Sequence, residues 1–204
     1  EGHFTDEDLA KIDEKTKIVA FAAVSNVLGM KRPIEKIIEK AHAVGAIAVL
    51  DGAQSAPHMK SDVQKWDCDF YAFSGHKMMG SAGTGVLYGK KKLLNAMEPF
   101  LSGGDMIEYV QEQSTTFEQV PFKFEAGTEN VEGAVALHAA IDYLEDLGFD
   151  EIERHEYELT KHCLEGLMKL PYVHILGSKD PEEKVGVIAF TIDGVHPHDV
   201  ATIL

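Results

Sequence analysis

The stretch DCDFYAFSGHKMMGSAGTGVLYG, residues 67–89, contains the pattern that decides the fold. Its two short apolar runs, 69–73 and 85–88, have the length and composition of buried strands. Between them, SGHKMMGSAGTG at 74–85 is too rich in glycine for a regular helix or strand. The sequence therefore predicts two strands joined by a glycine-rich loop that carries Lys77 near its start.

Upstream, two further apolar runs at 17–24 and 46–50 flank a helical pattern. Pro33 lies where the first turn of a helix tolerates proline, apolar residues then recur at three- and four-residue spacing, and Gly45 ends the pattern. A strand, a helix and a strand of these lengths form a parallel crossover unit. The first half of the chain is therefore predicted to be α/β with a mainly parallel sheet.

Downstream, residues 101–123 have weak periodicity and are predicted to be a long irregular excursion with a functional role. Residues 130–147 and 151–170 are predicted to be helices that meet near Gly148. We expect the core face of the first helix to comprise Val135, Ala136, Ala139, Ala140, Tyr143, Leu144 and Leu147. We expect that of the second to comprise Ile152, Leu159, Cys163, Leu164 and Leu167.

The pattern of strands and helices in the last part of the chain indicates a second, smaller domain. Strands are predicted at 173–176 and 185–192, followed by a turn and a helix near His198. We place the domain boundary near the end of the first long helix, so that 1–147 belong to a large domain and 148–204 begin a small α+β domain. Since the chain opens without methionine and closes on an apolar run, we expect both ends to be internal to a longer polypeptide.

The composition argues against several classes of function. A net charge of −15 repels phosphate backbones and anionic lipid, so neither nucleic acid nor a membrane is an expected partner. No run approaches the roughly 18 to 20 apolar residues of a membrane span. With two cysteines, Cys68 and Cys163, the chain has no disulfide framework, which favours the cytoplasm, although a targeting peptide could precede residue 1.

The cysteines and histidines also lack the patterns of reactive or metal-binding groups. Cys68 lies between two aspartates, which oppose thiolate formation, and Cys163 shares an apolar helix face, so both are interpreted as structural. His196 and His198 flank a proline and are interpreted as a turn and helix start rather than a ligand pair. No metal site is predicted.

Polar residues come directly after the predicted strands. Asn26 follows the first run, Asp51 the second, and Ser74, His76 and Lys77 follow the third. In open parallel α/β sheets, ligands bind beyond the carboxyl ends of the strands, so these side chains are expected to line one crevice.

Each of these residues also has an ordinary explanation. Asp51 could cap the turn that follows, Gln54 could lie on the surface, Ser74 could cap a turn, His76 could be structural, and lysines are usually exposed. However, the glycines and methionines around Lys77 favour a desolvated amine, which would be nucleophilic towards carbonyls. A carboxylate and such a lysine are the two groups that a pyridoxal phosphate (PLP) site requires.

Five segments carry a resemblance to a known family. AVSNVLG (23–29), VLDGAQSAPH (49–58) and the opening stretch (67–89) are similar to blocks of fold-type I PLP enzymes of aminotransferase class V. FLSGGDMI (100–107) and EAGTENVEG (125–133) resemble the group II, SufS-type cysteine desulfurases. The resemblance implies the large domain of an aspartate aminotransferase-like PLP-dependent transferase fold.

The resemblance also implies a role for each strand-end residue. Lys77 would hold the cofactor as a Schiff base and move protons at the substrate's α-carbon. Asp51 would pair with the pyridine nitrogen, and Gln54 would hydrogen-bond the phenolic oxygen. Asn26 would lie near the substrate carboxylate and the ring oxygen.

The phosphate would be held from two subunits. Ser74 and His76 would bind the phosphate of their own subunit, whereas Thr128 would reach across a homodimer interface to the partner's phosphate. A homodimer is therefore part of the implied site.

The implied activity is conversion of L-cysteine to L-alanine, with the sulfur passed as a persulfide to an acceptor protein for iron–sulfur cluster assembly. A selenocysteine lyase, or another class V lyase or transaminase, would use the same lysine and aspartate. In this family the sulfur-accepting cysteine and the substrate-binding arginine lie beyond the equivalent of Leu204, and the ring-stacking histidine lies upstream of residue 1. A second alternative is therefore that the 204 residues alone form an inactive, dimerising scaffold.

Overall fold

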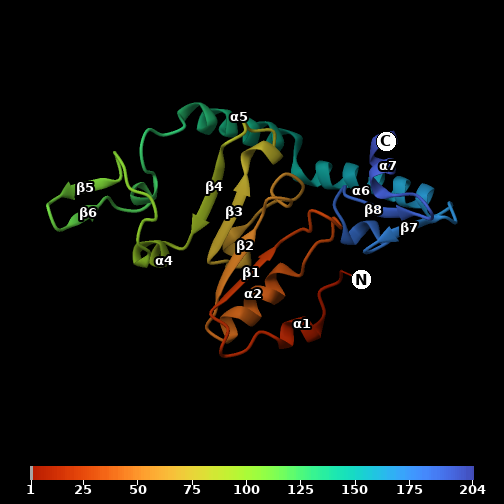
Figure 1. The fold of residues 1–204 in the computed structure, drawn as a ribbon, viewed down its shortest axis with the longest axis horizontal. Helices are drawn as coiled ribbons and strands as arrows, with labels where there is room; N and C mark the ends of the chain where they lie inside the picture. The colour runs from red at the N-terminus through yellow and green to blue at the C-terminus, as the bar shows by residue number, and fades with distance from the viewer. Residues whose placement is uncertain (1) are drawn as a thin grey trace.

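The centre of the molecule is a four-stranded sheet, seen in a computed structural model that describes residues 2–204 (Figure 1). The strand order is β1-β2-β3-β4, in which β1, β2 and β3 are parallel and β4 is antiparallel to β3. The strands are β1 Ile18–Ala22, β2 Ile47–Asp51, β3 Phe70–Ser74 and β4 Gly85–Gly89. The predicted α/β class with a mainly parallel sheet is therefore confirmed.

The crossover between β1 and β2 is the predicted helix, α2 Ile34–Ala43. Its buried residues, Ile34, Ile37, Ile38 and Ala41, follow the three- and four-residue spacing of one helix face. Gly45, with a φ of 77°, allows the chain to turn back into β2 because a positive φ is readily adopted only by glycine.

The two faces of the sheet differ in how they are covered. On one face, Ala48, Leu50 and Tyr71 are at most 3% exposed and pack against α2 and the short helix α3 Val63–Trp66. On the opposite face, Ile18 is 60% exposed and Leu87 55% exposed. The opposite face is therefore open in this chain.

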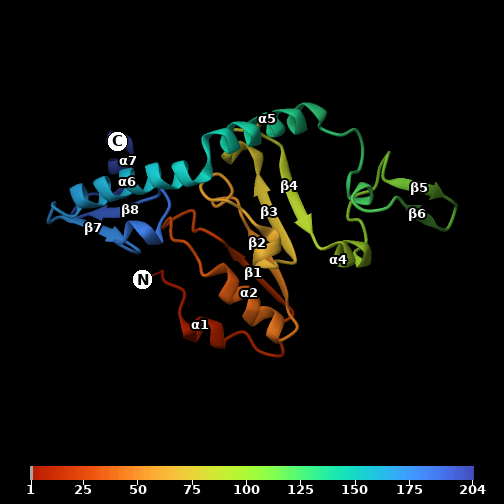
Figure 2. The ribbon, with the colours of Figure 1, turned by 180° about the vertical axis from the view of Figure 1, so that it is seen from behind.

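The excursion at 101–123 is more regular than predicted. It contains a two-stranded antiparallel hairpin of β5 Ile107–Val110 and β6 Thr115–Phe117. Figures 1 and 2 show this hairpin standing away from the central sheet. Periodicity did not reveal it because strands of four and three residues are too short to show a repeat. The other short elements between residues 2 and 130 are α1 Asp6–Ala10, η1 Gly75–Lys77, α4 Lys91–Ala96 and η2 Phe122–Phe124.

The helix α5 Val131–Leu147 runs past the end of the sheet towards which β3 points (Figure 1). Its predicted core face is partly wrong, because Val135 is 64% and Tyr143 52% exposed. The helix is apolar around much of its circumference, so spacing alone did not select the stripe that packs. The buried residues are Gly133, Leu137, Ala140 and Leu144.

The helix α6 Phe149–Leu167 starts directly after Gly148, and its predicted core face is also partly wrong. Leu159 is 57% exposed and Cys163 is exposed, whereas Thr160 and Leu164 are buried. One turn before Thr160, Glu156 Oε1 lies 2.6 Å from His58 Nδ1. This polar contact lies on the packed stripe, so the face towards the rest of the molecule is not the most apolar one.

The end of the chain is a second, two-stranded sheet of β7 Val173–Leu176 and β8 Ala189–Ile192, with η3 Pro181–Glu183 between them. The strand predicted at 185–192 starts later because residues before Ala189 bond elsewhere: Val185 N–H donates to Gly29 O. The last helix, α7 Pro197–Ile203, is capped by His196, as interpreted from the sequence. The break at Gly148 coincides with the predicted domain boundary, and the division into two domains stays a prediction.

Not one of the helices within residues 2–204 has the length and apolarity needed to cross a bilayer.

A buried carboxylate, Asp69, ties three elements together. Its Oδ2 accepts a hydrogen bond of 2.8 Å from Ala48 N–H in β2 and lies 2.9 Å from Nε2 of His42 in α2. Its Oδ1 lies 3.0 Å from Nζ of Lys90, which follows β4. Burial alone would raise the pKa of Asp69, but the hydrogen bonds from Ala48, His42 and Lys90 outweigh it and hold the pKa below its ordinary value.

We predict that Asp69→Asn lowers the free energy of unfolding by about 3 kcal/mol near pH 7, because it removes the charge that Lys90 and His42 face. A depressed folded-state pKa contributes stability above the unfolded pKa of about 3.9, and this contribution is lost as the pH falls through the folded pKa. The difference between wild type and variant should therefore narrow below about pH 4. Urea denaturation at several pH values measures this difference in the free energy of unfolding.

Asp146→Asn is a matched control, because Asp146 is exposed on α5. Its effect should stay within about 0.5 kcal/mol. An Asp69→Asn penalty that persists unchanged at pH 3 would contradict the charge-based explanation.

Candidate active site

Asp51, the last residue of β2, lies between two alanines. The strand register pairs it with Ala22 on β1 and with Ala72 on β3. Side chains in register on neighbouring strands point to the same face, and here that face is the open one. The two methyl groups leave room beside the carboxylate, so a flat ring can approach Asp51 from the side without meeting a bulky neighbour.

The turn after Asp51 is held from behind by Tyr71. The turn starts with Asp51 Oδ1 accepting the N–H of Ala53 at 2.8 Å. A Cβ atom on Gly52 would lie 2.2 Å from the Tyr71 ring, so the ring packs directly on the glycine backbone. The Tyr71 hydroxyl lies 2.7 Å from Ser61 Oγ and 3.4 Å from Ser55 Oγ, and burial raises its pKa. Asp51 is thus exposed on a backbone that cannot shift backwards.

Three residues that support this turn are not predicted from the sequence: Tyr71, Ser55 and Ser61. The sequence signal for Tyr71 is an aromatic residue in the strand that neighbours the one before Asp51-Gly52. This signal can be used only when the register of the two strands is known. Gln54, which was identified, is half-buried in the same turn.

The polar residues predicted after the third strand lie at the end of β3 and in the turn that follows it. Ser74 is the last residue of β3, and His76 and Lys77 lie on the short 3₁₀ turn η1. The Gly75 N–H donates to Thr84 O at 2.8 Å, and a Cβ atom on Gly75 would lie 3.0 Å from that oxygen. The glycine therefore allows the loop to fold back on itself directly beneath the lysine.

The expected desolvation of Lys77 is not found in this chain. Met78 is buried, but Lys77 itself is exposed, and Met79 is 67% exposed. The buried methionine packs under α5 with Leu137 and Leu144, so it serves the core and does not cover the amine. Any desolvation of Lys77 must come from groups outside residues 2–204 or from a bound molecule.

Asn26 is exposed on a tight loop after β1. The loop closes where Ser25 N–H donates to Met30 O at 3.0 Å and Gly29 N–H donates to Ser25 O at 2.9 Å. Asn26 and Asp51 therefore follow neighbouring strands, β1 and β2, at the same edge of the sheet.

Thr128 is exposed. The Gly127 N–H donates to Gly104 O at 3.0 Å, and Asn130 Nδ2 donates to Thr84 Oγ1 at 3.1 Å. The two segments at 100–107 and 125–133 are thus brought together beside the glycine-rich loop. Within residues 2–204, no hydrogen bond or ion pair joins Thr128 to Asp51, Ser74 or Lys77.

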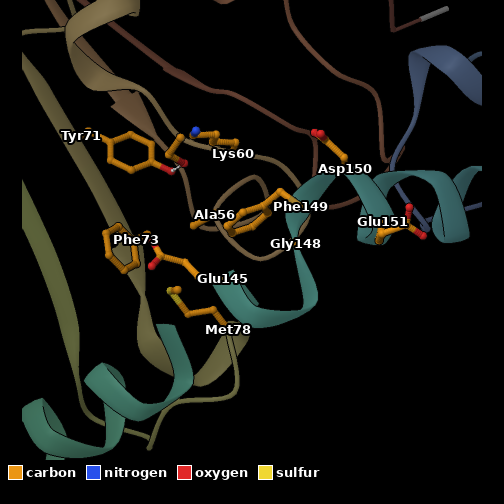
Figure 3. A pocket seen from close by; sticks show the side chains of 11 residues that line it. Ala56, Lys60, Tyr71, Phe73, Met78, Glu145, Gly148, Phe149, Asp150 and Glu151 are labelled. Atoms are coloured by element: carbon orange, nitrogen blue, oxygen red, sulfur yellow. Dashed lines mark hydrogen bonds between the residues drawn. The ribbon is translucent and has the colours of Figure 1, made fainter. Parts of the chain in front are cut away.

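A cavity of about 650 Å³ lies on the covered side of the sheet at the bend between α5 and α6 (Figure 3). Phe73, Met78 and Phe149 form its apolar wall. Three carboxylates, Glu145, Asp150 and Glu151, outnumber the single Lys60 at its rim. This charge opposes a phosphate, and none of the predicted site residues lines the cavity.

The two cysteines differ from each other. Cys68 is buried, and burial is the main reason that its pKa is raised, with Asp67 and Asp69 adding to it. It precedes β3 and so lies at the edge of the sheet opposite Asp51. Cys163 is free and exposed on α6, which corrects its interpretation as a core residue.

Comparison with known proteins identifies the family. The family model described as aminotransferase class-V matches residues 1–204. The chain belongs to the aminotransferase class-V family. The class V resemblance of the sequence segments is thereby confirmed.

Individual proteins are similar over nearly the whole chain. A probable cysteine desulfurase of Halalkalibacterium halodurans is 55% identical over 199 residues, 97% of this chain and 48% of the relative. The apo structure of a cysteine desulfurase from Thermococcus onnurineus superposes with a TM-score of 0.94 at 43% identity, covering 100% of this chain and 51% of that one.

A solved structure of C-DES, in which glycine is covalently linked to the PLP cofactor, has a TM-score of 0.84 at 26% identity. It covers 98% of this chain and 53% of the C-DES chain. The chain thus spans about half the length of the relatives that it matches.

We predict that Gly52→Ala lowers the free energy of unfolding by about 2 kcal/mol, because the added methyl group collides with the Tyr71 ring. Thermal or urea unfolding measures the change. Gly166→Ala is a matched control in α6, where a Cβ atom meets nothing within 4 Å. Equal stability of the two variants would show that Tyr71 can move away and that the turn after Asp51 is not fixed by it.

Proposed function

We propose that this chain is the cofactor-binding part of a PLP-dependent cysteine desulfurase. The observation that supports it most directly is Asp51 in register between Ala22 and Ala72 on the open face, with Lys77 after the adjacent strand. The named relatives support the reaction, because proteins at 45–55% identity are called probable cysteine desulfurases.

The strand-end residues fit PLP in kind as well as in place. A pyridinium nitrogen requires a carboxylate, which Asp51 offers, and an aldehyde requires an amine, which Lys77 offers. Ser74 and His76, together with the backbone of the turn after β3, offer hydrogen-bond donors to a phosphate. When bound, PLP withdraws electrons from the substrate's α-carbon and so weakens the bonds to that carbon.

In this proposal each residue has a defined task. Lys77 would hold the cofactor's aldehyde through its Nζ, and its free amine would take the proton from the substrate's α-carbon. Asp51 keeps the ring nitrogen protonated, because a carboxylate on a fixed turn stabilises the adjacent positive charge. Gln54 hydrogen-bonds the phenolic oxygen of the ring, and Asn26 orients the substrate carboxylate.

The sulfur would leave L-cysteine as a persulfide on the protein, with L-alanine as the product, and would pass to an acceptor protein for iron–sulfur cluster assembly. Neither Cys68 nor Cys163 is placed to receive it, because one is buried at the opposite edge of the sheet and the other is on α6. A homodimer in which Thr128 serves the partner's phosphate is in keeping with the exposure of Thr128. The two free cysteines are in keeping with a cytoplasmic enzyme.

We predict that borohydride fixes the cofactor on Lys77 in the full-length protein. Peptide mass spectrometry should find the added mass on the peptide that contains Lys77, and the near-visible absorbance of bound PLP should vanish. Lys77→Ala should show neither fixation nor the same absorbance band. Lys60→Ala, which changes an exposed lysine of the acidic cavity, should behave as wild type; fixation on any other lysine would overturn the assignment.

A second prediction concerns the 204 residues alone. Asp51, Lys77 and Thr128 are all exposed, so this chain by itself cannot exclude water from the reaction. We predict that it releases no sulfide from L-cysteine in the presence of PLP and a thiol reductant, whereas the full-length protein does. Methylene blue detection of sulfide measures this, and turnover by the short chain would show that its own residues complete the site.

A further inference from the structure

Lys184 is buried, which is unusual for a lysine. The residue is 3% exposed, and within the described part of the chain no carboxylate forms an ion pair with it. Its Nζ donates a hydrogen bond of 2.6 Å to the backbone oxygen of Leu28. Burial lowers the pKa of this ammonium. Because lysines are rarely buried unless paired, this position requires an explanation.

The oxygen that Lys184 holds belongs to the loop that carries Asn26. Inside this loop, Leu28 N–H donates to Ser25 Oγ at 3.1 Å and Gly29 N–H donates to Ser25 O at 2.9 Å. The corresponding oxygens point outwards: Leu28 O accepts from Lys184 Nζ, and Gly29 O accepts from the N–H of Val185 at 2.9 Å. The N–H groups of Leu28 and Gly29 thus bond within the loop, whereas residues 184–185 provide the donors for the Leu28 and Gly29 oxygens.

Steric contact also holds the loop that carries Asn26 against the segment at 183–187. Gly29 has a φ of 68°, and a Cβ atom there would lie 2.4 Å from the backbone oxygen of Val187. Met30 forms an isolated antiparallel bridge with Lys184, and Lys31 N–H donates to Glu183 O at 2.9 Å. The loop cannot move towards this segment, and it cannot move away without breaking the Lys184 hydrogen bond.

A second polar contact ties the turn after Asp51 to the same end of the chain. His58 Nδ1, beyond that turn, lies 2.6 Å from Glu156 Oε1 in α6. Lys184, His58 and Glu156 line one small cavity of about 260 Å³. Both strand-end loops are therefore attached to the part of the chain that follows Gly148.

We propose that Lys184 is a positioning residue: its hydrogen bond to the Leu28 oxygen sets the loop that holds Asn26 at the substrate side of the site. The inference rests on the proposed function, in which Asn26 orients the carboxylate of L-cysteine. Replacing the ammonium with an apolar group leaves the Leu28 oxygen without a donor and loosens the loop, which then keeps only the backbone hydrogen bonds of Gly29 and Lys31 to residues 183–185. Substrate binding then weakens more than the chemical step, since Lys77 and Asp51 lie on other loops.

The test compares Lys184→Met, Lys184→Arg and Lys179→Met in the full-length holoenzyme. Methionine keeps the length of the lysine stem without a donor, arginine restores a donor, and Lys179 is an exposed lysine on the same segment. In Lys184→Met, amide hydrogen exchange should accelerate about tenfold in residues 25–30 and not in β2 or β3, as expected for the loss of one charged hydrogen bond. The KM for L-cysteine should rise about tenfold with kcat within about twofold of wild type.

Lys184→Arg should recover most of the wild-type KM, and Lys179→Met should match wild type in both measurements. Unchanged loop exchange and an unchanged KM in Lys184→Met would overturn the proposal. Exchange that accelerates across the whole protein with an unchanged KM would also overturn it, because Lys184 would then contribute only to overall stability and not to the position of the loop.

If Lys184→Met does not fold, Gly29→Ala displaces the loop from Val187 while retaining the lysine, and it should raise loop exchange and KM in the same way. Wild-type loop exchange and KM in folded Gly29→Ala would overturn the proposal. The exchange experiment needs no cysteine turnover. A wild-type holoenzyme that leaves cysteine intact would therefore refute the proposed function, whereas wild-type loop exchange in Lys184→Met would refute only the role of Lys184.

Discussion

The parallel register of β1, β2 and β3 is the constraint on which the candidate site depends. Backbone hydrogen bonds align Ala22, Asp51 and Ala72 across three strands, and a shift of one residue would turn Asp51 to the covered face. The covered face prevents that shift, because Leu50 and Tyr71 are buried there against α2. The hydrophobic core thus determines where the carboxylate is displayed, although it contains none of the site residues.

Much of the fold could be predicted from the local pattern of apolar and polar residues. The crossover from β1 through α2 to β2 was predicted because each element has the periodicity and boundary residues of its class, and the polar residues at the strand ends followed from it. The β5–β6 hairpin was not predicted, since its strands are too short for a repeat. The packed face of α5 was partly wrong because that helix is apolar around much of its circumference. The packed face of α6 was partly wrong because Glu156 and Thr160, both polar, lie on the side that packs.

Within the site, the residues that would bind the cofactor were predictable from the sequence, but the residues that hold them in position were not. Asp51 and Lys77 stand out because each comes shortly after an apolar run, whereas Tyr71 and Lys184 act through partners far away in sequence. Lys184 meets Leu28 across 156 positions, so no local pattern indicates the contact. The exposure of Lys77 has the same origin, because composition around a residue does not reveal what covers it.

The open face and the ends of the sheet have a consequence for the chain in isolation. Within residues 2–204, β1 and β4 each pair on one side only, and their free edges offer unpaired N–H and C=O groups. Next to these edges, Ile18 and Leu87 are more than half exposed. Unpaired edges beside apolar surface are templates for intermolecular strand addition. The 204 residues alone would therefore self-associate edge to edge through β1 and β4 as their concentration rises.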